Sequence, residues 1–174
     1  LKPGEPGEGK VFRDINEDGR ITDEDRDYMG SAFPTLTGGL NLRFEYKGID
    51  LSLFFYGVYG NKIYNGPRVV LSEMKYGNYS VETYENYWRG EGTSEEWPRP
   101  TVLDRNQNNR MSQRWLEDGS YLRLSTMQLG YTLPGNLVTR IPGVEGIRVY
   151  LSGSNLLTFT KYTGFDPDIT NNGL

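Results

Sequence analysis

Apolar and polar side chains alternate along four stretches of this chain, and the alternation is its clearest structural signal. In residues 36–47 the even positions are apolar or glycine, while the odd positions carry mostly polar and charged side chains. A period of two gives a β-strand one apolar and one polar face. Lys47-Gly48 then allows a tight turn, and the pattern predicts a second strand over residues 49–63.

Two later stretches, residues 121–133 and 147–162, repeat this alternation. In the first of them the apolar positions change from even to odd numbers near Ser125 and Thr126. An extra residue in one strand causes such a change of phase, so we expect a β-bulge there. The last stretch keeps its apolar side chains on odd positions and predicts a fourth strand.

The connections between these stretches differ in length. The tight turn joins the first pair, residues 134–146 join the last pair, and the long segment 64–120 lies between them, with a short helix expected at 81–88. Long loops on one side and short turns on the other are typical of outer-membrane β-barrels, whose strands need about 9 to 11 residues to cross the bilayer. A soluble antiparallel sheet with one wet face explains the alternation equally well.

A barrel also predicts where particular side chains lie. Tyr46, Tyr59, Tyr131 and Tyr150 fall toward strand ends, where aromatic girdles would meet the two membrane interfaces. If the apolar faces meet lipid, the opposite faces line a lumen. The side chains expected there are Asn41, Arg43, Glu45, Asp50, Ser52, Arg148, Ser152 and Ser154.

Composition excludes several function classes. The 174 residues contain no cysteine and no histidine, so disulfide scaffolds, cysteine chemistry and Ser-His or Cys-His triads are impossible. The formal net charge of -4 argues against a nucleic-acid-binding surface. No apolar run reaches the roughly 18 residues of a membrane helix.

Residues 14–25 read DINEDGRITDED and match the calcium loop of EF-hand proteins. That loop places oxygen ligands at positions 1, 3, 5, 7 and 12 and a glycine at position 6. Thr22 is expected to cap a helix over 23–28, with a capping box. We expect a structural Ca²⁺ ion here, and the alternative is a capped turn of mutually repelling acids. The expected ligands are Asp14, Asn16, Asp18, the carbonyl of Arg20, and Asp25.

Three further features carry possible chemistry. The aromatic residues of the long segment can stack on cargo or simply pack that segment; the candidates are Tyr76, Tyr79, Tyr84, Tyr87, Trp88 and Trp97. Glu117 and Asp118 are paired carboxylates, as in glycosidases, but adjacent side chains usually diverge, so we favour a turn that leads into a strand. Asp166-Pro167-Asp168 is interpreted as a rigid start of a loop, with a ligand role as the alternative.

Four long motifs together resemble one family. They are FRDINEDGRITDEDRDYMG, LTGGLNLRFEYKGIDLSLFFYGVYGNKIYN, NRMSQRWLEDGSYLRLSTMQLGYTLP and IRVYLSGSNLLTFTKYTGFDPDI. In this order and spacing they are similar to the C-terminal barrel region of SusC/RagA-type TonB-dependent outer-membrane transporters of Bacteroidetes. The resemblance extends from about residue 11 to residue 169.

The resemblance implies a 22-stranded barrel, an upstream plug, energy drawn through TonB, and a SusD-like surface lipoprotein over the extracellular mouth. The cargo of such pairs is a glycan or, in some members, a peptide. We therefore expect residues 1–174 to be part of a longer outer-membrane receptor. The plug, the TonB box and the terminal strand of that receptor are expected to lie outside these residues. Residues 11–30 and 64–120 would then lie in extracellular loops.

The expected fold class is all-β, with about four antiparallel strands of a transmembrane β-barrel, long extracellular loops and a short helix. The expected function is a share in glycan or peptide import, without enzymatic activity. The alternative function is a secreted, calcium-stabilised, β-rich carbohydrate-binding or dockerin-like module. A glycosidase is disfavoured because no well-placed pair of acids appears.

Overall fold

The computed structural model describes residues 13–20, 22–72, 77–94, 97–102, 111–138 and 142–169, and its contacts divide the chain into two compact units. We call the first the loop unit; it comprises Leu1–Gly30, Ile63–Glu117 and Thr163–Phe165. We call the second the sheet unit; it comprises Ser31–Lys62, Asp118–Tyr162 and Asp166–Leu174.

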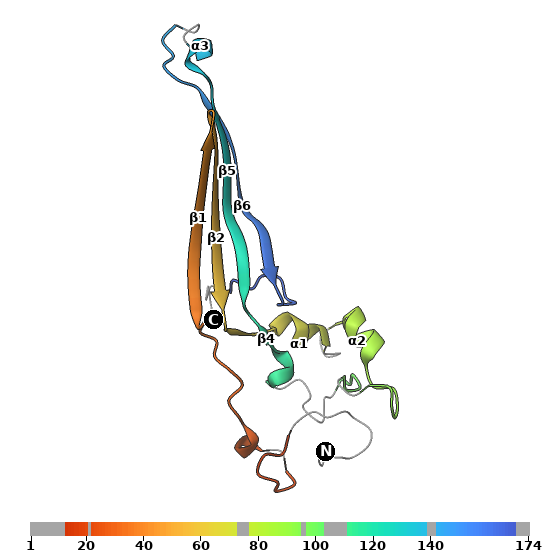
Figure 1. The fold of residues 1–174 in the computed structure, drawn as a ribbon. Helices are drawn as coiled ribbons and strands as arrows, with labels where there is room; N and C mark the ends of the chain where they lie inside the picture. Colours follow the sequence, from red (N-terminus) through yellow and green to blue (C-terminus); the bar gives the residue numbers. More distant parts are fainter. Residues whose placement is uncertain are drawn as a thin grey trace. The chain divides into compact units, whose positions relative to one another are not determined.

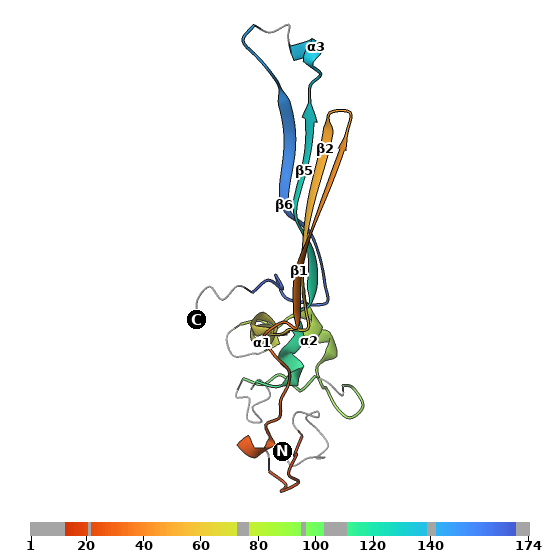
Figure 2. The ribbon, with the colours of Figure 1, turned by 60° about the vertical axis from the view of Figure 1, so that its left-hand side comes forward.

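The sheet unit is a four-stranded antiparallel sheet with the strand order β1-β2-β5-β6. Its strands are β1 (Leu36–Tyr46), β2 (Ile49–Tyr59), β5 (Tyr121–Thr132) and β6 (Arg148–Thr160). The short helix α3 (Gly135–Val138) lies in the connection between β5 and β6. The β1–β2 turn and α3 lie at the same end of the sheet (Figures 1 and 2). The expectation of long antiparallel strands is therefore confirmed.

A two-residue turn joins β1 to β2. Lys47 and Gly48 both have positive φ angles, 49° and 84°. Positive φ at both central positions defines the type I′ turn, whose twist matches that of the flanking strands. A Cβ atom on Gly48 would lie 2.8 Å from the carbonyl oxygen of Thr132, so this position requires glycine for space as well as for its conformation.

The strand register produces one continuous apolar face. Directly paired residues of antiparallel strands point to the same side of a sheet, and a central row joins Leu42, Leu53 and Met127. Most of the large side chains on this face are exposed. The face consists of Leu36, Leu40, Leu42, Phe44, Tyr46, Ile49, Leu51, Leu53, Phe55, Tyr59, Leu122, Leu124, Met127, Leu129, Tyr131, Val149, Leu151, Leu157 and Phe159.

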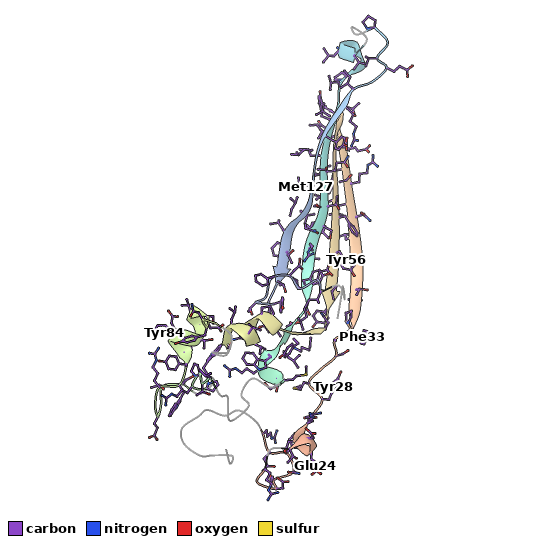
Figure 3. The ribbon with its side chains drawn as sticks, turned by 180° about the vertical axis from the view of Figure 1, so that it is seen from behind. Glu24, Tyr28, Phe33, Tyr56, Tyr84 and Met127 are labelled. Atoms are coloured by element: carbon purple, nitrogen blue, oxygen red, sulfur yellow. The ribbon has the colours of Figure 1, made fainter. Side chains whose placement is uncertain are left out.

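The opposite face is polar along most of its length, and we call it the wet face. Every residue expected to line a lumen lies on it: Asn41, Arg43, Glu45, Asp50, Ser52, Arg148, Ser152 and Ser154. In Figure 3, Tyr56 belongs to the wet face and Met127 to the apolar face. The sequence alternation thus predicted both faces correctly.

The irregularity expected near Ser125 and Thr126 is confirmed. The pairing of β2 with β5 shifts between Phe54 and Phe55, and Ser125 has no direct partner in either neighbouring strand. The pairing of β5 with β6 shifts at the same place, where Asn155 has a positive φ of 51°. The bulge changes the phase of β5, so Leu124 and Met127 both reach the apolar face.

Two details differ from the sequence-based expectation. Tyr150 pairs with Gly130, whose other partner is Asp50, so it lies on the wet face and does not belong to an apolar-face girdle. The second strand ends at Tyr59 because Gly60 has a φ of 87° and interrupts the extended backbone. The following residues form the separate strand β3 (Lys62–Tyr64), which pairs with β4 (Leu116–Asp118).

The loop unit contains short helical elements: η1 (Asp23–Asp25), α1 (Gly66–Ser72), α2 (Val81–Asn86) and η2 (Gln113–Trp115). Ser80 caps α2, because its hydroxyl oxygen accepts a hydrogen bond from the Thr83 amide at 3.2 Å. The buried side chains include Trp115, with 0% exposure, and Trp97, Val69 and Thr83. The described part of the chain has no helix with the length and apolarity needed to cross a membrane.

Candidate functional site

The acidic loop 14–25 is organised by hydrogen bonds between its side chains and its backbone. The amide of Gly19 donates to Asp14 Oδ2 at 2.8 Å, and the amide of Arg20 donates to Asp18 Oδ1 at 2.7 Å. The amide of Asp18 donates to Asn16 Oδ1 at 3.2 Å. Gly19 has a φ of 79°, which allows the sharp turn that the calcium-loop template requires at its position 6.

Asp25 closes this loop. Its Oδ1 accepts from the Ile15 amide at 2.8 Å, and its Oδ2 accepts from the Thr22 amide at 2.7 Å. Thr22 and Asp25 form the expected capping box. The hydrogen bonds from Thr22 and Ile15 outweigh the small effect of burial, so the pKa of Asp25 is lowered and the group is ionised at neutral pH.

The helix after this loop is shorter than expected. The sequence predicted helix over 23–28, whereas η1 is a single 3₁₀ turn that ends at Asp25, because Arg26 is already extended. Ile21, at position 8 of the calcium-loop template, lies outside the described residues. The capped turn forms as expected, and it is followed directly by extended chain.

The donor atoms of the loop are only partly gathered. Asp14 Oδ1 is buried and has no hydrogen-bond partner, which leaves one carboxylate oxygen available to a cation. Within the described residues, however, no three His, Cys, Asp or Glu side chains lie close enough together to hold a metal ion. The donors therefore have the kind and order that Ca²⁺ requires, but they would have to draw together around an ion.

Aromatic side chains gather around α2 in the loop unit. The rings of Tyr79 and Tyr84 are stacked at 6.3 Å, and Tyr87 lies 6.4 Å from Tyr84. The guanidinium of Arg89 lies 4.6 Å from the centre of the Tyr87 ring and also donates to the Tyr84 carbonyl at 2.6 Å. Tyr84 is 56% exposed and is labelled in Figure 3. We call these four residues the tyrosine cluster.

Trp97 and Trp88 pack differently from this cluster. Trp97 is buried, with the guanidinium of Arg114 at 4.4 Å and that of Arg68 at 5.4 Å from its ring centre. Its carbonyl accepts a hydrogen bond from the Trp88 amide at 3.0 Å. The packing alternative therefore fits Trp97. Tyr76, the remaining candidate of the long segment, lies outside the described residues.

Glu117 belongs to a partly buried polar network in the loop unit. Its carboxylate accepts from Asn65 Nδ2 at 2.9 Å and from the Thr163 amide at 2.7 Å, and Arg68 Nη1 lies 3.4 Å away. Burial alone would raise its pKa, but the bonds from Thr163 and Asn65 and the Arg68 charge lower the pKa overall. Asn65 also begins α1, since its Oδ1 accepts from the Arg68 amide at 3.0 Å.

The hydrogen-bond partners of Asp118 differ from those of Glu117. Its Oδ1 accepts from the hydroxyl of Ser120 at 2.7 Å and from the Ser120 amide at 3.1 Å. Those bonds lower the pKa of Asp118. The two adjacent carboxylates therefore diverge and are engaged by separate structural hydrogen bonds. This arrangement supports the turn interpretation over a pair of catalytic acids.

An ion pair crosses the wet face near the β1–β2 turn. Arg148 of β6 donates from Nε to Asp50 Oδ1 at 3.0 Å and from Nη2 to Asp50 Oδ2 at 2.5 Å. The pair passes over Gly130 of β5, where a Cβ atom would lie 2.5 Å from Asp50 Oδ1. Asp50 and Arg148, together with Arg43 and Ser52, line a groove on this face.

A second charged cluster lies at the other end of the wet face, and it includes the Asp166-Pro167-Asp168 segment. Arg123 of β5 donates from Nη2 to Asp166 Oδ1 and from Nε to Thr158 Oγ1 at 3.0 Å. Its Nη1 lies 3.5 Å from Asp168 Oδ2. We call this group the Arg123 clamp. Sequence reasoning did not single out Arg123, although its place between Leu122 and Leu124 indicates the wet face.

Comparison with known proteins identifies the relatives of this chain. No protein-family model matches it. TonB-dependent receptor P3 of Formosa agariphila is 37% identical over 165 residues, which cover 94% of this chain and 16% of that receptor. TonB-dependent receptor SusC of Bacteroides thetaiotaomicron is 25% identical over 175 residues, covering 95% of the chain and 16% of SusC.

Solved structures give the same relationship. The RagAB peptide importer in its open-open state matches 90% of this chain and 17% of the importer chain, with 29% sequence identity and a TM-score of 0.68. The RagAB peptide transporter matches 86% of the chain and 16% of that chain, with 29% identity and a TM-score of 0.69. The chain thus spans 16% of the length of the curated relatives described above.

These relationships confirm the resemblance, the partial barrel fold and the outer-membrane location expected from the sequence. TonB-dependent receptors are not enzymes, so the expectation of a non-enzymatic protein is confirmed as well. The relatives do not support the alternative of a secreted module. Over nearly all of its length, the chain is homologous to one segment of the SusC-type TonB-dependent receptors of the outer membrane.

Proposed function

We propose that this chain forms part of the wall of a TonB-dependent importer, with its apolar face against lipid and its wet face toward the transport conduit. The observation that carries the proposal is the exposed apolar face that continues across all four strands of the sheet. Soluble proteins rarely leave apolar patches of such extent uncovered. In a barrel, lipid hydrocarbon chains cover the apolar face, while water inside the barrel hydrates the polar groups of the opposite face.

The two edges of the sheet support the same proposal. β1 and β6 are edge strands of 11 and 13 residues, and long unpaired edges invite aggregation unless further strands pair with them. Closure into a barrel removes all such edges. We therefore expect neighbouring strands of the same receptor to pair with β1 and β6, within the 22-stranded barrel that the resemblance implies.

The order of the elements supports an orientation of the strands. The β1–β2 turn and α3 lie in the connections at one end of the sheet, which we assign to the periplasmic side because barrels carry their short connections there. On this proposal residues 64–120 form an extracellular loop, and a SusD-like lipoprotein covers the mouth. TonB would act through a part of the receptor outside this chain.

We favour a glycan as the cargo, and a peptide is the second candidate because the solved relative RagAB is a peptide importer. The tyrosine cluster supports a carbohydrate, since aromatic rings with an exposed face stack on sugar rings, and Tyr84 is 56% exposed. Binding of labelled oligosaccharides and peptides to the full-length receptor decides between them. Tyr84→Ala is expected to weaken glycan binding, and Tyr131→Ala, on the apolar face, to leave it unchanged.

We also propose that residues 14–25 bind one structural Ca²⁺ ion. Asp14, Asn16, Asp18, the Arg20 carbonyl and Asp25 are oxygen donors in the required order, and the buried Asp14 Oδ1 lacks a partner. An ion among these carboxylates offsets their mutual repulsion and would stiffen the loop. It supplies no chemistry to transport.

Calcium titration of the purified receptor, followed by hydrogen exchange of residues 13–25, tests this site. Calcium is expected to slow exchange in the wild-type loop at least tenfold and to leave the Asp14→Asn variant nearly unaffected. Asp27→Asn, outside the loop, is the matched control and should respond like the wild type. Exchange that ignores calcium in all three proteins rejects the site.

The importer proposal is tested with the full-length gene product. We expect it to fractionate with the outer membrane, to require detergent for extraction, and to migrate differently on a gel before and after heating. Recovery in the soluble fraction, with no change of migration on heating, would contradict the proposal.

A further inference from the structure

We propose that Arg123 is a positioning residue which fixes segment 166–168 against the wet face of the sheet and so makes this segment part of the conduit lining. The inference rests on the proposed function only in naming that face the conduit side. The contact itself lies within the sheet unit. Figure 1 shows the chain after β6 turning back past the ends of β5 and β2.

All three guanidinium nitrogens of Arg123 have partners. Nη2 donates to Asp166 Oδ1, Nη1 faces Asp168 Oδ2 at 3.5 Å, and Nε donates to Thr158 Oγ1 at 3.0 Å. The ring of Tyr121 lies on the guanidinium with its centre 5.1 Å from Cζ. The planar fork of arginine can serve several directions at once, which the single point charge of lysine cannot do.

Burial makes this contact obligatory for Arg123. Its side chain is 7% exposed, and a buried charge without an opposite charge is strongly unfavourable. Of the described residues, the acids that pair with it are Asp166 and Asp168. Detaching segment 166–168 would therefore leave the guanidinium buried without an opposite charge. Strand β5 and the segment thus hold each other in place.

The segment itself is preorganised for this contact. Asp166 Oδ1 accepts the Asp168 amide at 2.8 Å, and Pro167 between them fixes its own φ angle. Burial would raise the pKa of Asp166, but the bonds from Asp168 and Arg123 lower it overall, so the carboxylate is charged at neutral pH. The bent segment thus presents both carboxylates to one arginine.

Both carboxylate side chains are partly exposed to solvent. The side chain of Asp166 is 57% exposed and that of Asp168 is 41% exposed, whereas the arginine is covered. A cargo on this side of the sheet therefore meets a surplus of negative charge and hydrogen-bond acceptors. This surface favours ligands with hydroxyl or ammonium groups over anionic ligands.

Hydrogen exchange of the full-length receptor in detergent tests the clamp. The Asp168 amide donates to Asp166 Oδ1, which is also the atom that Arg123 holds. Loss of the clamp frees this acceptor, so the exchange rate of the Asp168 amide reports how long the segment stays on the sheet. Arg123→Gln, which removes the charge but keeps a polar side chain, is expected to accelerate exchange in residues 166–169 at least tenfold. Arg123→Lys is expected to give an intermediate rate.

Arg148→Gln is the matched control. Arg148 lies on the same wet face and pairs with Asp50 at the other end of the sheet. Its loss should leave exchange in residues 166–169 unchanged. A control that accelerates exchange equally would overturn the clamp, because the effect would then be a general loosening of the sheet.

A second set of variants keeps the test independent of strand folding. Asp166→Asn combined with Asp168→Asn changes only the loop and should accelerate exchange as much as Arg123→Gln. Adding Arg123→Gln to that pair should cause little further change, since the contact is already lost. Unchanged exchange in the loop variant, or full additivity in the triple variant, would refute the clamp.

The outcomes also separate this inference from the importer proposal. Heat-modifiable migration of the wild-type receptor tests the barrel, and the exchange rates test the clamp. If the wild-type receptor migrates as a barrel but exchange in residues 166–169 does not change on replacement of Arg123, the clamp is rejected and the importer proposal stands. If the wild-type protein is soluble but exchange in residues 166–169 depends on Arg123, the importer proposal is rejected and the clamp stands.

Discussion

Leu53 lies in the central row of the apolar face, and its replacement by arginine tests what that face meets. Leu42 and Met127 are its direct neighbours across the sheet. The 11 residues of β2, at about 3.3 Å each, give about 36 Å, and a tilt near 45° reduces this to the roughly 25 Å apolar band of barrels. Position 53 would then lie close to the bilayer midplane.

The expected cost follows from that depth. An arginine on the lipid face costs about 2 to 4 kcal/mol at the midplane and about 0 to 1 kcal/mol near the interfaces. We therefore expect Leu53→Arg to lower the free energy of unfolding by about 3 kcal/mol. Ile49→Arg, in the last row beside Tyr46 and Tyr131, should cost less than about 1 kcal/mol.

The assay is reversible urea unfolding of the full-length receptor in lipid vesicles. Ser154→Arg is the control, since Ser154 lies on the wet face in the row next to Leu53 and is exposed. It should change the free energy of unfolding by less than about 1 kcal/mol. The three variants add the same side chain and differ in face and depth.

Two results would refute the reasoning. Equal costs for Leu53→Arg and Ile49→Arg would show that depth in a bilayer does not matter, as expected for a face buried under another protein layer. A cost for Ser154→Arg as large as that for Leu53→Arg would show that the two faces do not differ.

Three further predictions concern single contacts. Gly130→Ala should lower the free energy of unfolding by about 1 to 3 kcal/mol in the same urea assay, because its Cβ collides with Asp50 and displaces the ion pair. Asn65→Ala should cost about 2 kcal/mol and increase hydrogen exchange in α1, since it removes a helix cap and a buried donor to Glu117. The pKa of Glu117 is lower in the folded protein than its unfolded value of 4.5, so its charged form stabilises the fold. This stabilisation is complete above pH 4.5 and is lost as the pH falls through the folded pKa. The difference in the free energy of unfolding between wild type and Glu117→Gln should therefore shrink below pH 4.5.

The strands were predictable because one face of each is apolar along its whole length. β1, β5 and β6 begin and end within two residues of the expected limits, and the change of phase near Ser125 located the bulge. Alternation reports only which face a side chain takes. It therefore predicted the wet face correctly but placed Tyr150 in a girdle, since an aromatic ring is acceptable on either side of a strand end.

The loop unit was less predictable, because its short helices carry no extended periodicity. α1 begins at a capping Asn65 and was not expected, while the helix after Thr22 is shorter because Arg26 is already extended. The Arg123 clamp joins residues 43 positions apart along the chain. Sequence spacing gives no signal for such a contact, because a wet-face position predicts a hydrated arginine and not one that is 7% exposed.

The central claim, that one face of the sheet meets lipid and the other meets water, is tested most directly by a nitroxide scan of positions 49–59 in the full-length receptor in vesicles. The chain contains no cysteine, so each label within it is unique. We expect accessibility to oxygen to peak at positions 51, 53 and 55, and accessibility to a water-soluble nickel chelate to peak at the positions between them. Labels at 51, 53 and 55 that reach neither reagent, or that reach the chelate, would contradict this account.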